Sequence, residues 1–240
     1  MPYRNMTLEE LARHIGMDVR EVYKLADRGR LPGRKVGGQW RVNRAQVTEW
    51  LQQEAHTLSN EQLVNLERAM GNGAHDDEEM IVSNRLGLEA IDMHMNAKSK
   101  PSVLRYLVEM VGATGMLYDK EGLLDSVMER ESLGSTALPN GLAIPHPRQP
   151  MPYATAEPLL CLGRVQAGVY FDARGGGLTD VFVLICSHDD RSHLQVLARL
   201  MRMFDDELLT DLRSTDEPET ALHMILSKEE RVVDKLKKTS

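Results

Sequence analysis

A short stretch, GNGAHDDEE at residues 71–79, most constrains how these 240 residues can fold. It combines glycines with a run of four acidic residues and offers no side chain suited to a hydrophobic core. Apolar residues recur with regular spacing on both sides of it, so we expect a domain boundary there. The predicted organisation is an N-terminal domain at 1–54, a helix and acidic flexible linker at 55–79, a larger domain at 80–228 and a polar tail at 229–240.

Charge is divided unevenly between these parts. Residues 1–54 carry ten Lys or Arg and seven Asp or Glu, a net charge of +3, whereas the whole chain carries −7. The rest of the chain therefore carries −10. A basic segment inside an acidic protein favours a nucleic-acid contact that is confined to the N-terminal domain.

Nothing in the sequence indicates export or membrane insertion. No apolar run approaches the roughly 20 residues that a membrane-spanning helix needs. The charged start, Met1 to Glu10, lacks the apolar stretch of a signal peptide. The two cysteines, Cys161 and Cys186, lie in apolar runs typical of buried strands rather than in a disulfide framework. We therefore expect a cytoplasmic protein.

The first 54 residues are patterned like a small helical domain with a hairpin. Thr7 and Glu10 form a capping-box pattern in front of an apolar helical stripe. Asp18 is placed to cap a second helix. Between two short β-rich runs, Gly37-Gly38 suits the positive φ angles of a tight hairpin, and a third helical pattern follows. The predicted order is helix, turn, helix, hairpin, helix.

This order, with Gly38-Gln39-Trp40-Arg41 in the hairpin, strongly resembles the excisionase and MerR-like winged helix-turn-helix family over residues 5–54. The resemblance implies double-stranded DNA as a partner. Basic side chains on the outward face of the second helix and in the hairpin are placed to reach base edges or phosphates. The DNA-binding candidates are Arg20, Tyr23, Lys24 and Arg28 in the helical part and Arg34, Lys35 and Arg41 in and around the hairpin.

Beyond residue 80 the pattern becomes mixed α/β. We expect strands near 90–95, 142–144, 158–165, 168–171 and 180–187, helices near 99–111, 121–131 and 193–204, and two short closing helices. Within this region, ERESLGSTALPNGLAIPHPR closely resembles type 2 IIA domains of the phosphoenolpyruvate sugar phosphotransferase system, of the mannitol, fructose and nitrogen-regulatory kind. The resemblance covers roughly residues 80–228. The fold class is then α/β: a winged helix-turn-helix domain plus a IIA-type domain whose central mixed sheet is flanked by helices.

The resemblance implies that His146 accepts a phosphoryl group from a phosphohistidine on a small HPr-like phosphocarrier protein. Imidazole suits this role because a large fraction of it is unprotonated near neutral pH. Arg130 and His193 match the arginine and the second histidine of the family, and would stabilise the phosphoryl charge. Pro147 departs from the family, so one backbone N–H beside His146 is missing. The further phosphate-binding candidates are Ser135, Thr136 and Arg148.

Three functions remain open at this level. The first is a DNA-binding regulator in which phosphorylation of His146 links the state of the phosphotransferase system to transcription. The second is a phosphoryl-carrier component of a sugar transport system. The third is a fusion whose second domain is not phosphorylated and acts as a sensor or an oligomerisation platform. The DNA-binding head favours the first, and Pro147 favours the third. In the first two, the domain is a phosphohistidine carrier rather than a free-standing catalyst.

A homodimer is expected, because so small a head makes few DNA contacts by itself. Leu63, Leu66 and Met70 could supply a dimer helix, or the IIA-like domain could supply the contact. We expect no cofactor and no metal. The histidines of the larger domain lack a tight ligand pair with supporting carboxylates.

Overall fold

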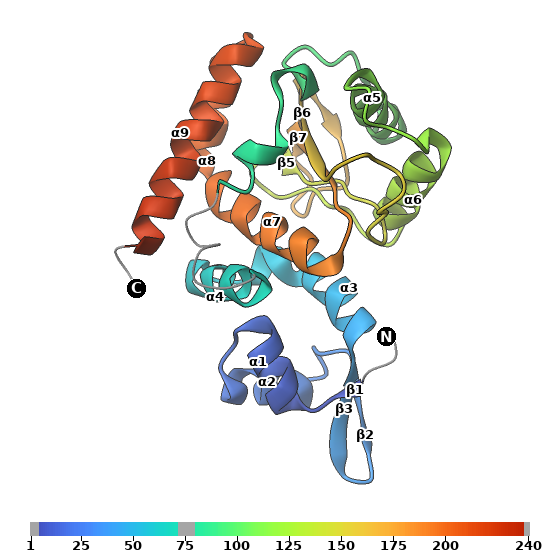
Figure 1. Cartoon of the computed structure of the whole chain (residues 1–240), viewed down its shortest axis with the longest axis vertical. Helices are drawn as coiled ribbons and strands as arrows, with labels where there is room; N and C mark the ends of the chain where they lie inside the picture. The colour runs from blue at the N-terminus through green and yellow to red at the C-terminus, as the bar shows by residue number, and fades with distance from the viewer. Residues whose placement is uncertain (1–4, 72–79, 238–240) are drawn as a thin grey trace.

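The computed structural model describes residues 5–71 and 80–237 (Figure 1). Residues 72–79 of the predicted linker and 238–240 of the predicted tail lie outside these ranges. Within them, no helix has the length and apolar character required to cross a membrane.

The N-terminal domain has the predicted order of elements. It comprises β1 (Asn5–Met6), α1 (Leu8–Ile15), α2 (Val19–Asp27), β2 (Gly33–Val36), β3 (Gln39–Asn43) and α3 (Arg44–Glu54). The capping box forms at α1, where the side chains of Thr7 and Glu10 each accept a hydrogen bond from the other's backbone N–H. Gly37 and Gly38, with φ of 58° and 79°, make the turn of the β2–β3 hairpin. The winged helix-turn-helix prediction is confirmed.

The larger domain is built on a four-stranded sheet of order β4-β6-β7-β5. Its strands are β4 (Ile91–Asp92), β5 (Leu142–Ala143), β6 (Leu159–Tyr170) and β7 (Leu178–Cys186). The central pair β6–β7 is antiparallel, and each outer strand joins it in parallel, so the predicted mixed sheet is confirmed. The strands predicted at 158–165 and 168–171 form the single strand β6, whose register with β7 shifts between Arg164 and Val169.

Helices cover both sides of this sheet (Figure 1). They are α5 (Lys100–Ala113), α6 (Lys120–Ser132), α7 (Asp190–Met203), α8 (Asp206–Arg213) and α9 (Pro218–Lys237). In Figure 1, α5 and α6 lie to one side, α8 and α9 to the other, and α7 faces the N-terminal domain. Residues 229–237, which the charge pattern assigns to a polar tail, continue α9. Glu229 and Val232 are buried there, so this part is a packed helix.

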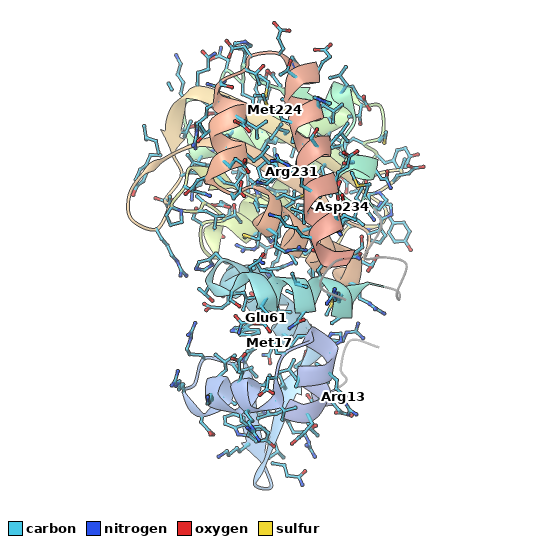
Figure 2. All side chains as sticks on the ribbon, turned by 90° about the vertical axis from the view of Figure 1, so that its left-hand side faces the viewer. Arg13, Met17, Glu61, Met224, Arg231 and Asp234 are labelled. Carbon is cyan, nitrogen blue, oxygen red and sulfur yellow. The ribbon has the colours of Figure 1, made fainter. Side chains whose placement is uncertain are left out.

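The two domains are joined by η1 (Ala55–Thr57) and α4 (Asn60–Met70). In both views α4 lies between the head and the larger domain, with Glu61 of α4 and Met17 of the head near the junction in Figure 2. The side chains of Leu63, Leu66 and Met70 are buried in the core of the head, which also includes Leu194 and Ala198 of α7. They fill a core within the chain and do not form an exposed dimer helix. The homodimer stays a prediction.

A buried ionic cluster strengthens this junction. Glu67 of α4 accepts hydrogen bonds from Nη2 of Arg199 and from Nη1 of Arg202, both at 2.6 Å. Arg199 also donates to Glu229 of α9 at 2.9 Å, and its side chain is fully buried. The cluster ties α4 to α7 and α9, so the head is held against the larger domain by buried charge as well as by apolar packing.

Candidate phosphoryl-transfer site and DNA-binding surface

Three side chains from separate segments meet beside α7. Arg130 comes from the last turn of α6, His146 from the loop after β5, and His193 from the first turn of α7. Arg130 Nε lies 3.1 Å from His146 Nε2, and the two imidazole centroids are 4.7 Å apart. The exposed fractions of Arg130, His146 and His193 are 3%, 1% and 3%. The structure thus brings together the three residues predicted to carry phosphoryl transfer.

The hydrogen bonds of His146 fix which ring nitrogen carries the proton. Its Nδ1 lies 2.9 Å from the carbonyl oxygen of Ile144, which can only accept, so the proton resides on Nδ1. Nε2 then holds a free electron pair, which accepts the hydrogen bond from Arg130 Nε. The backbone N–H of Ile185 donates to Pro145 O and pins the loop to β7. The ring therefore presents a nucleophilic nitrogen in a fixed orientation.

Burial keeps both imidazoles neutral. Burial is the main cause that holds the pKa of His146 well below its usual range; a proton on His193 and the charge of Arg130 would act in the same direction. Burial, followed by the charge of Arg130, lowers the pKa of His193 to about 4. The Nε2 atom of His193 has no hydrogen-bond partner among the described residues. A neutral nucleophile thus stands beside an unsatisfied ring nitrogen and a guanidinium.

The depressed pKa of His193 predicts a loss of stability on acidification. Between pH 6.5 and 4 the unfolded chain binds a proton at this histidine and the folded chain does not. The free energy of unfolding should fall by about 3 kcal/mol over that window from this group, at a slope near 1.4 kcal/mol per pH unit. Urea unfolding of wild type and His193→Gln at several pH values measures it. In His193→Gln the free energy of unfolding should depend less steeply on pH, whereas the exposed control His223→Gln should keep the wild-type dependence. Parallel plots of unfolding free energy against pH for wild type and His193→Gln would contradict the depressed pKa of His193.

The other predicted phosphate ligands are engaged elsewhere. The Ser135 hydroxyl donates to the carbonyl oxygen of Phe171, and the Thr136 hydroxyl donates to Glu131 at 2.7 Å. Both residues line the cavity beside His146, where they hold the loop. The guanidinium of Arg148 pairs with Glu129 on the surface. The geometry therefore concentrates phosphate-binding capacity in Arg130 and His193.

Residues of α3 and η1 close over this site. The carbonyl oxygen of Gln52, near the end of α3, lies 3.5 Å from Arg130 Nη2. His56 of η1 meets Arg174, with 2.6 Å between Nε2 and Nη1. A cavity of about 40 Å³ between these segments reaches His146. Sequence reasoning missed Gln52, His56 and Arg174, because none of them belongs to a motif and only tertiary docking brings them together.

Comparison with known proteins agrees with this architecture. A family model described as the phosphoenolpyruvate-dependent sugar phosphotransferase system, EIIA 2, matches residues 86–228, which is more than half of the chain. The chain belongs to this family. A helix-turn-helix domain model matches residues 6–55, so an EIIA type 2 domain and a helix-turn-helix domain share one polypeptide.

Relatives of the EIIA domain come from both transport and regulation. The nitrogen regulatory protein of Pseudomonas aeruginosa is 33% identical over 131 residues, covering 53% of this chain and 82% of that protein. The fructose-specific EIIABC component of Bacillus subtilis is 24% identical, and the match covers 63% of this chain but only 24% of that component. The nitrogen regulatory protein IIA-Ntr of Neisseria meningitidis has the same fold, with a TM-score of 0.55 at 22% identity over 60% of this chain and 99% of that chain.

The predicted DNA-binding residues lie on the head, in α2, in the segment after it and in the β2–β3 hairpin. In Figure 1 the β2–β3 hairpin projects away from that domain. The side chains of Tyr23 and Arg41 make local bonds, to Glu9 and to Gln39, and Lys35 Nζ lies 5.2 Å from the centroid of the Trp40 ring. The exposed candidates are Arg20, Tyr23, Lys24, Arg28, Arg34 and Lys35, whereas Arg41 is half-buried.

Proposed function

We propose that this protein is a DNA-binding regulator whose EIIA domain accepts a phosphoryl group on His146 from an HPr-like phosphocarrier. The observation that carries the proposal is the meeting of Arg130, His146 and His193, with an unprotonated Nε2 on His146, in a chain that also holds a winged helix-turn-helix domain. A transport intermediate needs no DNA-binding head, so the head favours regulation over sugar transport. We expect the protein to act in the cytoplasm.

The transfer itself follows from the hydrogen bonds. Nε2 of His146 forms a bond to phosphorus while the P–N bond to the donor's histidine breaks, and that electron pair returns to the donor ring. The Nδ1–H of His146 remains hydrogen-bonded to the carbonyl oxygen of Ile144, and this bond stabilises the positive charge that the ring gains. The guanidinium of Arg130 turns from Nε2 to the phosphoryl oxygens, and His193 supplies a nearby ring nitrogen.

The hairpin supports DNA binding by the head. Arg34 and Arg41 are directly paired across β2 and β3, so two cations point from the same face of the hairpin. Like charges opposite one another destabilise a strand pair unless an anion lies between them. A phosphate backbone provides such an anion, and α2 lies beside the hairpin in position to enter a groove.

One incubation tests the phosphoryl-acceptor half of the proposal. The full chain is mixed with phosphoenolpyruvate, Enzyme I and an HPr-type carrier, and its intact mass is followed with time. We expect the gain of a single acid-labile phosphoryl group. No gain under conditions in which the carrier itself becomes phosphorylated would contradict the proposal.

Burial of His146 and the presence of Pro147 favour a second candidate function. In it, the EIIA domain exchanges no phosphoryl group and serves as a sensor or as a platform for assembly. The same incubation separates the two candidates, because only a phosphoryl acceptor gains mass.

Salt dependence tests the DNA-binding half. Replacing Arg34, Lys35 and Arg41 together by alanine should weaken binding to all duplex sequences, because it removes cations that meet phosphates. The slope of log affinity against log salt concentration should flatten by about 0.9 for each phosphate that is no longer neutralised, which fluorescence anisotropy with a labelled duplex measures. The control Lys98→Ala/Arg105→Ala removes two exposed cations from the EIIA domain and should leave the slope unchanged. An unchanged slope in the triple variant would show that the hairpin is not part of the DNA-binding surface.

A further inference from the structure

The proposed phosphoacceptor is inaccessible while the head is docked. A protein donor must bring its own phosphohistidine into line with Nε2 of His146, so both partners need an open surface around that atom. Only 1% of His146 is exposed. Gln52 of the head and His56 of η1 lie over the site together with Arg174 of the EIIA domain, and they leave a cavity of about 40 Å³. By that volume it holds only a few water molecules.

The head also directs a carbonyl oxygen and a carboxylate charge toward the guanidinium of Arg130, which the phosphoryl oxygens would need as their partner. The carbonyl oxygen of Gln52 faces Arg130 Nη2 at 3.5 Å. Burial lowers the pKa of Arg130, and the charges of Glu131 and, to a smaller extent, of Glu49 in α3 oppose that effect. A phosphoryl group on His146 would bring about two negative charges to the same guanidinium. It would repel Glu49 and compete with the Gln52 carbonyl, which disfavours the docked head.

We propose that residues 52–56 form a plug over His146, and that docking of this plug and binding of the phosphoryl donor exclude each other because they use one surface of the EIIA domain. The donor half of this inference rests on the proposed function. The closed state is the resting form of the chain. Phosphorylation traps the open form, in which α3 and η1 have moved off His146.

The DNA-binding surface is not covered in the closed state. The hairpin lies at the far end of the head from the EIIA domain (Figure 1), and Arg20, Lys24 and Arg34 are exposed. The closed form can therefore occupy DNA while its phosphoacceptor is shielded. Opening moves the head relative to the EIIA domain, and this movement is the step by which phosphorylation would alter the spacing of two heads on an operator.

The contact between His56 and Arg174 offers a charge test in the full chain. His56→Lys places two cations together and should open the plug. His56→Glu adds an ion pair with Arg174 and should close it further. The double variant His56→Lys/Arg174→Glu restores attraction and should behave like wild type. The control His94→Lys makes the same replacement at an exposed histidine of the EIIA domain, just after β4, and leaves His223 in place.

Two measurements are made on each variant. Diethyl pyrocarbonate, which modifies neutral accessible imidazole, is mapped onto His146 and onto exposed His223 by peptide mass; the depressed pKa of His146 means that protonation cannot protect it. The second measurement is the initial rate of phosphoryl transfer from phosphorylated HPr. In wild type, His146 should react with the reagent at least about ten-fold more slowly than His223. The rate of modification of His146 and the rate of phosphoryl transfer should both rise about three-fold in His56→Lys, which is the size of effect expected for a partly exposed charge pair. Both rates should fall below wild type in His56→Glu and return to the wild-type value in the double variant.

Equal reactivity of His146 and His223 in wild type would overturn the plug, as would rates at His146 that are the same in His56→Lys and His56→Glu. If the reagent shows opening but no variant accepts a phosphoryl group, the plug stands and the proposed function fails. If transfer occurs at equal rates in all variants while the reagent shows opening, exclusion of the donor fails and the phosphoacceptor assignment stands.

Discussion

A chain in which His146 is replaced by alanine is expected to gain no phosphoryl group from phosphorylated HPr, whereas wild type gains one. The physical reason is that the unprotonated Nε2 of His146 is the nucleophile of the proposed transfer. It lies within hydrogen-bond distance of the Arg130 guanidinium. His193 cannot substitute for it without a rearrangement, because its ring centroid lies 4.7 Å away and its backbone is fixed in the first turn of α7. Intact mass under non-acidic conditions measures the gain.

The control for this variant is His223→Ala, an exposed histidine on α9 whose loss should leave the gain unchanged. Full labelling of His146→Ala would show that another residue accepts the group. Circular dichroism at the transfer temperature checks that the variant is folded, since a buried imidazole is being removed.

Replacing Arg130 should slow phosphoryl transfer without changing which residue accepts the phosphoryl group. Arg130→Lys keeps a cation but loses the planar fork that bonds His146 and the carbonyl oxygen of Gly134 together. Transfer should slow by about 100-fold, the scale for removing one preorganised donor from a developing anion. Lysine is preferable to alanine here, because Arg130 is buried and also holds the loop at Gly134.

Local signals in the sequence predicted the elements well. The Thr7 capping box and the Gly37-Gly38 turn act within a few residues, so their physics is readable from the chain alone. The frame around His146 predicted its meeting with Arg130 and His193 through family resemblance. The charge pattern after Lys228 was misleading, because Glu229 is buried against Arg199 and the helix continues past it.

The cover over the site was not predictable from the sequence. Gln52 and Arg130 are far apart in the chain, and the contact between them uses a backbone carbonyl that any residue carries. Glu67, in the short helix predicted before the linker, pairs with Arg199 only because α4 docks on α7. Such contacts depend on how two finished surfaces fit together, which neither periodicity nor a motif encodes.

Glu67→Ala is expected to destabilise the junction strongly. The side chain is 2% exposed and accepts from both Arg199 and Arg202, so its removal leaves two guanidiniums in a buried cluster that lacks one carboxylate. Breaking a buried pair in this way costs about 3–5 kcal/mol, because the remaining charge is desolvated without full compensation. Urea unfolding followed by tryptophan fluorescence should show it, since both tryptophans of the chain, Trp40 and Trp50, lie in the head.

The matched control is Glu61→Ala, an exposed glutamate on the same helix, which should change the unfolding free energy by no more than about 0.5 kcal/mol.

The buried cluster holds α4 against α7, and α7 carries His193 of the proposed site. The weakened junction should therefore also expose His146, and its reaction with diethyl pyrocarbonate should accelerate in Glu67→Ala but not in Glu61→Ala. A large loss of stability without faster modification would mean that the plug stays in place after the junction weakens. Equal stability of the two variants would mean that the Glu67 cluster contributes nothing to holding the head.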